Sequence, residues 1–290
     1  MQILTDVAIV TDSIASIPNE IMQSLNIQCV PYYIHRGNEV LRDLVNVHCA
    51  DFYNWMKTTK ELPKTASPGI GDYYAKYTQL IQQGVKDIIS IHMSSKGSGA
   101  YQAALAAKTM LAENFPQINL EVIDSFNVAM CQGWMAIESA RAAINGSSLA
   151  QIVQMVNEMI PKTRMIQTAD SLKYLYMGGR IGHAKHLVAS LLNIKPLISM
   201  ENGEIIALGT TISRQRAYKA MLNIIETSVG VMGKIKIAYV HAAAEEEVLK
   251  IKRIVEERIT CVESLVTELS PALGVHSGPG TAGVSFFPIP

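Results

Sequence analysis

The sequence carries little charge and no excess of either sign. Lys and Arg together number 25, Asp and Glu also number 25, and charged residues make up 17% of the 290 residues, against an average of about 25% in soluble proteins. A protein whose main partner is DNA, RNA or an anionic membrane normally carries a basic excess or a basic stripe. The composition therefore argues against these partners.

Long apolar runs and paired cysteines are also missing. No stretch reaches the roughly 18 uninterrupted apolar residues of a membrane-spanning helix, so we expect no transmembrane segment. The first six residues lack the charged region and the small-residue cleavage site of a signal peptide. Cys29, Cys49, Cys131 and Cys261 lie far apart with no CxxC motif, which suits free thiols in a reducing compartment better than disulfides or a zinc knuckle. These absences predict a cytoplasmic protein.

The standard nucleotide and metal motifs are absent or misplaced. No GxxxxGK[ST] occurs. Gly278, Gly280 and Gly283 do spell GxGxxG, but the Val-Ser-Phe-Phe-Pro that follows is a strand pattern, whereas the dinucleotide motif requires a helix there. His183 and His186 lie three residues apart on an expected helix, without an acidic or cysteine partner at a suitable spacing. We therefore expect no bound metal and no nucleotide held by these motifs.

Apolar residues are plentiful, at 49%, and in the first half they form short runs that alternate with helical patterns. The continuous apolar character of these runs favours strands buried on both faces. Alternation of strand and helix predicts an α/β domain with a parallel, Rossmann-like sheet and helices on both faces. The expected strands are 7–11, 28–34, 87–92 and 120–124, and the expected helices are 18–25, 70–83, 100–113, 128–145 and 148–160.

The pattern changes after Pro161. Two apolar runs, 195–199 and 204–208, flank Asn202-Gly203, a dipeptide typical of a hairpin turn. Such pairing predicts an α+β domain with a mixed or antiparallel sheet. A chain of 290 residues is long enough for two domains, and we place them at 1–161 and 162–290, packed closely because no flexible linker separates them. The second domain has further expected helices at 214–228 and 244–259, and strands at 235–240, 264–269 and 283–287.

Four segments place glycine beside Ser, Thr, Arg or His at the ends of strands or helices, where α/β proteins bind ligands. Hydroxyls and free N–H groups at a helix amino terminus, as expected in the second segment, can form an anion pocket. The segments are 64–69, 94–101, 177–182 and 275–283. Each also has a purely structural interpretation: Thr65 and Ser67 as helix caps, Ser98 in a turn, Arg180 at the surface near a helix end, and His276 in a turn.

Seven short motifs occur in order along nearly the whole chain. Each is weak alone, but together they resemble the DegV family, whose members include the fatty-acid-binding (FakB-type) subunits of bacterial fatty acid kinase. The motifs are Val10-Thr11-Asp12-Ser13-Ile14-Ala15-Ser16-Ile17-Pro18 (family VTDSxAxxP), Thr65-Ala66-Ser67-Pro68 (TSQP), Ser95-Lys96-Gly97-Ser98-Gly99-Ala100-Tyr101 (SxxSGTY/F), Asp124-Ser125 (DS), 172–181 (LxxLxxGGRI), 192–196 (LLxIKP) and His276-Ser277-Gly278-Pro279-Gly280 (HxGPG).

The resemblance implies a two-domain α/β protein with a lipid tunnel and a bound long-chain fatty acid as its ligand. It also implies that the chain is not itself the catalyst, but presents the fatty-acid carboxylate to a separate ATP-dependent kinase subunit, which forms an acyl phosphate. A basic segment that meets the kinase in the family falls on Arg214 or Arg216. Carried over by position, the carboxylate-binding residues would be Thr65, Ser98, Ser95, Gly99 through its N–H, Arg180 and His276.

Two positions depart from the family pattern. Ser67 replaces the Gln of TSQP, and Ala100 replaces the Thr of SGT, which removes one hydroxyl from the expected pocket. Two alternatives stay open, and only the second rests on these departures. One is a lipid or thioester hydrolase with Ser98 as nucleophile and His276 as base, although no GxSxG motif supports it. The other is a structural member that no longer binds lipid.

Overall fold

The computed structural model describes residues 6–59, 61–190, 194–230 and 233–289. Its first sheet contains four parallel strands in the order β2-β1-β6-β7, which confirms the predicted α/β organisation of the first half. The strands are β1 (Val7–Asp12), β2 (Gln28–Val30), β6 (Asp87–His92) and β7 (Asn119–Asp124).

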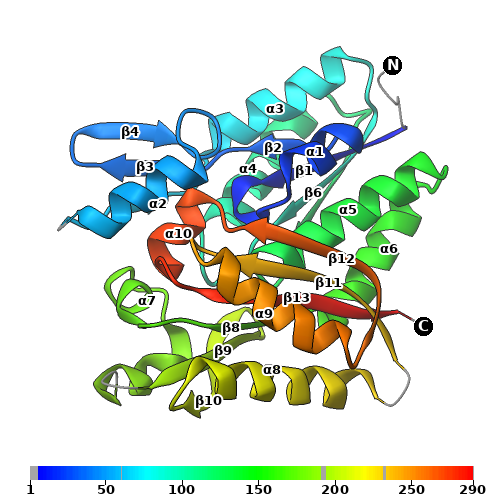
Figure 1. Ribbon diagram of the computed structural model, residues 1–290. Coiled ribbons are helices and arrows are strands. Elements are labelled where there is room, and N and C mark those ends of the chain that lie inside the picture. The colour runs from blue at the N-terminus through cyan, green and yellow to red at the C-terminus, as the bar shows by residue number, and fades with distance from the viewer. Residues whose placement is uncertain (1–5, 60, 191–193, 231–232, 290) are drawn as a thin grey trace.

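Helices cover both faces of this sheet (Figure 1). Helix α5 lies between the first sheet and the large second sheet and is buried along nearly its whole length. Its Trp134 Nε1 donates to the carbonyl oxygen of Ser285 in the second sheet at 3.1 Å, so one helix contributes to the core on both sides. The helices of this half are α1 (Asn19–Ser24), α2 (Cys49–Thr58), α3 (Ile70–Gln82), α4 (Ala100–Asn114), α5 (Met130–Ile144) and α6 (Leu149–Met159).

The second sheet is mixed, as predicted, with the order β10-β9-β8-β13-β11-β12. Only β11 and β12 pair in parallel; the other pairs are antiparallel. Asn202 and Gly203 both have positive φ and form the predicted hairpin turn. The strands are β8 (Arg164–Thr168), β9 (Lys195–Glu201), β10 (Glu204–Thr211), β11 (Lys234–His241), β12 (Thr260–Glu268) and β13 (Ala282–Ile289), and the helices over one face are α8 (Arg214–Val229) and α9 (Glu245–Glu256).

A third, small sheet was not expected from the sequence. The single strand predicted over 28–34 is wrong: it is two strands, β2 and β3, that belong to different sheets. Pro31 lies between them, and because proline lacks an N–H it cannot continue a ladder of hydrogen bonds. The small sheet is antiparallel in the order β4-β3-β5, with β3 (Tyr33–Arg36), β4 (Glu39–Arg42) and β5 (Lys64–Ala66).

Short helices occur in and beside two of the four glycine-containing segments, 177–182 and 275–283. Helix α7 (Lys173–Met177) ends before Gly178, and 182–190 form a 3-10 helix that contains His183 and His186. His276 lies in helix α10 (Pro271–Ser277), so its placement in a turn was wrong. Ser270 caps this helix and Pro271 begins it, an arrangement that helix starts favour. The motif at 192–196 begins outside the described residues.

Helix α10 lies between β12 and β13 of the second half in sequence, and it packs against both α7 and the first half of the molecule. It contacts α2, β3 and β5, and the Ala272 N–H donates to Asp43 Oδ1 at 3.1 Å. Burial raises the pKa of the Asp43 carboxyl to about 6. Gly274 permits the close approach, because a Cβ there would lie 2.4 Å from the Tyr53 hydroxyl. This docking carries His276 to the first domain. The division of the chain into domains at 1–161 and 162–290 stays a prediction.

Candidate functional site

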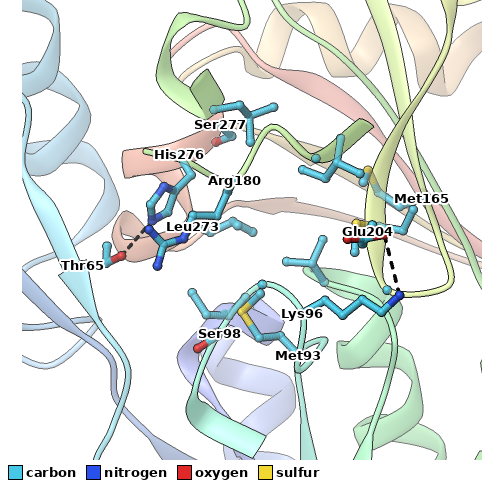
Figure 2. Close-up of a pocket in the computed structure, with 18 of the residues that line it drawn as sticks. Thr65, Met93, Lys96, Ser98, Met165, Arg180, Glu204, Leu273, His276 and Ser277 are labelled. Carbon is cyan, nitrogen blue, oxygen red and sulfur yellow. Dashed lines mark hydrogen bonds and ion pairs between the residues drawn. The ribbon is translucent and has the colours of Figure 1, made fainter. Parts of the chain in front are cut away.

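A cavity of about 640 Å³ lies between the two halves of the molecule. It opens beyond the carboxyl ends of β1 and β6, where parallel sheets commonly bind ligands. The β9–β10 hairpin and α10 form the opposite wall. The six residues carried over from the family motifs all line this cavity, and Figure 2 shows several of them. These six are Thr65, Ser95, Ser98, Gly99, Arg180 and His276.

Thr65 and His276 form a pair across the two halves of the chain. Thr65 Oγ1 lies 2.7 Å from His276 Nε2, as Figure 2 shows. Burial, and then the nearby charge of Arg180, lower the pKa of His276 to about 4, so the imidazole is neutral at neutral pH. When Nε2 carries the proton and donates to Thr65, the Thr65 hydroxyl is left to donate into the cavity.

Two glycines make room for this arrangement. A Cβ at Gly178 would lie 2.3 Å from His276 Nδ1, so the first glycine of the GGRI motif allows the imidazole to pack against the backbone. Gly278 has a φ of +77°, and a Cβ there would lie 2.1 Å from Tyr174. Glycine at these positions is therefore required by close approach, and at Gly278 also by backbone conformation.

Ser98 belongs to a second pair, with Tyr32. The two hydroxyl oxygens lie 2.6 Å apart, and the Ala100 N–H donates to Ser98 Oγ at 3.2 Å. Tyr32 is a lining residue that the sequence motifs missed. It stood inside a run predicted to be one buried strand and therefore looked like an ordinary core residue. Pro31 was the signal that the run breaks at this point.

Arg180 lies at the exposed rim of the cavity, just after the end of α7. Its Nη1 donates to the Gly178 carbonyl oxygen at 2.7 Å, and Figure 2 shows the guanidinium group beside His276 and Thr65. The side chain is at the surface, as the structural interpretation expects, and it also lines the cavity, but its role in binding stays a prediction.

The loop with Ser95 and Gly99 forms the amino-terminal end of α4. The Ser95 N–H donates to Asp124 Oδ2 at 3.2 Å, so the DS motif at the end of β7 holds this loop in place. Gly99 is the cap residue of α4 and faces Ser67, whose Oγ would lie 3.5 Å from a Cβ at position 99. The interpretation of Ser67 as a helix cap was wrong: Asp72 caps α3, accepting from the Gly69 N–H at 2.8 Å.

Away from these groups the cavity has both apolar and polar lining side chains, and the polar ones include Gln102, Gln167 and Thr168. One charged pair also faces it: Lys96 Nζ lies 3.7 Å from Glu204 Oε2, and Figure 2 shows this pair on the opposite side from Thr65 and His276. The apolar lining side chains are Ile14, Met93, Val128, Met165, Ala169, Leu175, Ile198, Met200, Ile205 and Leu273.

Arg214 and Arg216 lie outside the cavity lining. Arg214 is half-buried and forms an ion pair with Asp170 at 2.8 Å. Its Nη2 also donates to the Gly280 carbonyl oxygen at 2.6 Å. Arg214 therefore anchors the loop that follows His276. Arg216, in contrast, is exposed.

The hydrolase alternative requires Ser98 and His276 to be joined, and they are not. His276 Nε2 contacts Thr65, while Ser98 contacts Tyr32. An imidazole with a pKa of about 4 is a weak base at neutral pH, and its Nδ1 has no hydrogen-bond partner among the described residues that could orient it. Within the same part of the chain, no group of three or more His, Cys, Asp or Glu side chains could hold a metal ion.

The fold is that of a two-domain α/β protein with a large cavity between its two halves. Comparison with known proteins agrees. A family model described as "Uncharacterised protein, DegV family" matches residues 6–289. The chain belongs to the DegV family.

Individual relatives match over nearly the whole chain. Protein DegV of Bacillus subtilis is 30% identical over 280 residues, covering 96% of this chain and 98% of that protein. A crystal structure described as DegV, a fatty acid binding protein from Bacillus subtilis, matches with a TM-score of 0.85 and 29% identity, covering 98% of this chain and 99% of that one. A DegV family protein from Thermus thermophilus, described by its fatty acid binding, has the same fold, with a TM-score of 0.91 at 23% identity over 99% of this chain and 100% of that one.

No helix in the described ranges is both long and apolar enough to cross a bilayer.

Proposed function

We propose that the protein binds a long-chain fatty acid, with the carboxylate at the Thr65–Ser98 end of the cavity and the tail in the apolar part. The observation that carries this proposal is the separation of chemistry within one cavity. Two hydroxyls, a neutral imidazole and a guanidinium group gather at one end, and ten apolar side chains, together with polar ones, line the rest of the cavity. The fatty acid binding described for the Bacillus subtilis relative supports the same ligand.

The energetics of a fatty acid fit this arrangement. A sixteen-carbon tail gains about 0.8 kcal/mol for each buried CH₂, or about 11 kcal/mol in all, before the costs of ordering and association. A carboxylate cannot be buried without compensating donors. Thr65 and Ser98 supply hydroxyl donors, the Gly99 N–H lies at the start of α4, and Arg180 supplies positive charge at the rim.

We further propose that the chain is a cytoplasmic binding subunit and not a catalyst. It would present the carboxylate to a separate kinase subunit, which transfers the γ-phosphoryl group of ATP to a carboxylate oxygen and releases ADP. The resemblance to FakB-type subunits motivates this step. Exposed Arg216 is the proposed docking residue, and Arg214 supports the same surface through its contacts with Asp170 and Gly280.

Ligand identity is tested by denaturing the purified protein and extracting it for lipid mass spectrometry. The same protein, after delipidation, is then titrated with a long-chain fatty acid. We expect an acyl chain in the extract and saturable uptake by the delipidated protein. Absence of any acyl chain together with no uptake would contradict the proposal.

The kinase step is tested with protein loaded with a labelled fatty acid. Incubation with ATP alone should give no acyl phosphate, measured as the hydroxamate after hydroxylamine trapping, whereas addition of a fatty acid kinase catalytic subunit should give it. Arg216→Glu should lower the rate with the kinase and leave fatty acid binding unchanged. Lys219→Glu is the matched control, because Lys219 is also exposed on α8. Equal rates for both variants would contradict docking at Arg216.

A further inference from the structure

One lining side chain, Tyr32, has no counterpart among the motifs that led to the site. It is 3% exposed, and its hydroxyl lies 2.6 Å from Ser98 Oγ. Its backbone N–H donates to Ser13 Oγ at 3.0 Å, so the motif after β1 fixes its place. The ring therefore enters the cavity from a segment anchored on both sides, by Ser13 and by Ser98.

The protons and acceptor positions of the Ser98 and Tyr32 hydroxyls determine which hydrogen bonds they can make with a ligand. A serine hydroxyl has one proton and two acceptor positions. Ser98 Oγ already accepts from the Ala100 N–H. When the Tyr32 phenol donates to the remaining acceptor position, Ser98 has its own proton left and no acceptor position left. The Ser98 hydroxyl then offers only a donor to the cavity, which suits an anion.

The Tyr32 phenol is suited to the donor role. Burial, and then the charge of Asp12, raise its pKa well above the ordinary value of 10, so it keeps its proton at neutral pH. Donation by one hydroxyl to another also polarises the second and strengthens the hydrogen bond that it makes in turn. This matters here because Ala100 stands where the family pattern has threonine, and one hydroxyl of the expected pocket is missing.

We propose that Tyr32 is a positioning residue for the ligand carboxylate: its O–H donates to Ser98 Oγ and directs the Ser98 proton to the carboxylate. This proposal rests on the proposed function. Tyr32 thereby compensates in part for the hydroxyl that is absent at Ala100. It also favours a ligand group that only accepts hydrogen bonds, such as a carboxylate, over one that must also donate, such as the hydroxyl of a fatty alcohol.

The test is a double-mutant cycle on delipidated protein, titrated with palmitic acid and with hexadecanol. Tyr32→Phe should weaken palmitic acid binding roughly three- to tenfold, the scale of one hydrogen bond, with a smaller change for hexadecanol. In a Ser98→Ala background, Tyr32→Phe should have no further effect, because its partner is gone. Tyr33→Phe is the matched control: the Tyr33 hydroxyl donates to Asp72 at 2.7 Å, near the surface, and this variant should bind like the wild type.

Each outcome is decisive. Wild-type protein that binds palmitic acid, with Tyr32→Phe equal to it, would overturn the role of Tyr32 and leave the proposed function intact. If Tyr32→Phe weakens palmitic acid binding equally in the wild-type and Ser98→Ala backgrounds, Tyr32 does not act through Ser98. Wild-type protein that binds no palmitic acid would overturn both proposals. A circular dichroism melting curve for each variant separates loss of binding from loss of fold.

Discussion

Two histidines of this molecule, buried His92 and half-buried His276, have very different surroundings. His92 lies at the end of β6, where its Nδ1 is 3.0 Å from Asp12 Oδ2 and its Nε2 is 2.7 Å from Ser90 Oγ. His276 has Thr65 on one nitrogen, and its other nitrogen has no hydrogen-bond partner among the described residues. Both rings are polar groups taken out of water, but only the first has partners for both nitrogens.

The difference distinguishes a structural polar cluster from a binding site. Around His92, Asp12 also accepts from the Ile14 N–H and from Gln132, and Tyr77 donates to Ser90. Buried networks with nearly all hydrogen bonds made stabilise one structure. Around His276, hydroxyl and cationic groups keep hydrogen-bonding capacity directed toward the cavity. Unused capacity of this kind is what a ligand can satisfy.

The largest effect is expected from breaking the His92 network. Asp12→Ala removes the acceptor of His92, of the Ile14 N–H and of Gln132. Loss of this acceptor leaves several buried donors unmet, at about 1–3 kcal/mol for each, or about 3–5 kcal/mol in all. We expect the free energy of unfolding to fall by this amount in urea denaturation. Thr65→Val, at the cavity, should cost far less stability; equal losses would erase the distinction between the two regions.

The second effect is a pH dependence caused by His276. Its pKa is about 4 in the folded protein, against an ordinary value of 6.5, so between these values the unfolded chain binds a proton that the native protein does not. Stability contributed by the neutral ring is complete above pH 6.5 and is lost as the pH falls toward 4, by about 2–3 kcal/mol.

The His276→Gln variant isolates this contribution. Its free energy of unfolding should fall less steeply than that of the wild type between pH 6.5 and 4, measured by urea denaturation at each pH. Asp43 has the opposite sign, because its pKa is raised to about 6, but it is present in both proteins and cancels from the difference. Parallel pH profiles for wild type and variant would show that His276 does not titrate as described.

A third test removes one hydrogen-bond donor to the ligand from the cavity and leaves the core intact. Ser98→Ala should weaken fatty acid binding by about 1–3 kcal/mol, the cost of an unmet hydrogen bond to a buried polar or charged group, measured by isothermal titration calorimetry. Ser139→Ala is a matched control, since Ser139 is a buried serine that donates to a helix carbonyl in α5. A similar loss of affinity in both variants would mean that the effect at Ser98 is not local.

The smallest effect is expected at the rim. Arg180 is exposed, so water and salt screen its charge. Arg180→Met should weaken fatty acid binding by about 1 kcal/mol and raise the pKa of His276, followed by NMR titration of the imidazole. Lys96→Met provides the comparison, because Lys96 lines the same cavity beside Glu204. If Lys96→Met weakens fatty acid binding more than Arg180→Met does, the carboxylate lies beside Lys96 and Glu204 and not at the Thr65–Ser98 end of the cavity.

Much of the fold followed from local patterns. Buried parallel strands have continuous apolar runs, which is why β1, β6 and β7 were predicted within a residue of their ends. The small sheet was missed because β5 has only three residues, Lys64–Ala66, too few for any alternation to show. Helix α10 was missed because the glycines after His276 dominated the pattern, although Ser270 and Pro271 are a typical helix start.

The site could be predicted where short motifs carry it, and not where distant contacts do. Thr65, Ser98 and His276 were expected in one pocket through the family resemblance, and the structure places all three on one cavity. Tyr32 could not be found in this way. Its role depends on a hydroxyl contact across 66 positions of sequence, and no local pattern records such a contact.

The orientation of the ligand is the most direct test of this account, and a crystal structure of the protein with palmitic acid measures it. We predict carboxylate density within hydrogen-bond distance of Thr65 Oγ1 and Ser98 Oγ, with the tail among Met93, Ile198 and Met200. Carboxylate density beside Lys96, or a cavity without acyl density after soaking at saturating ligand, would contradict it.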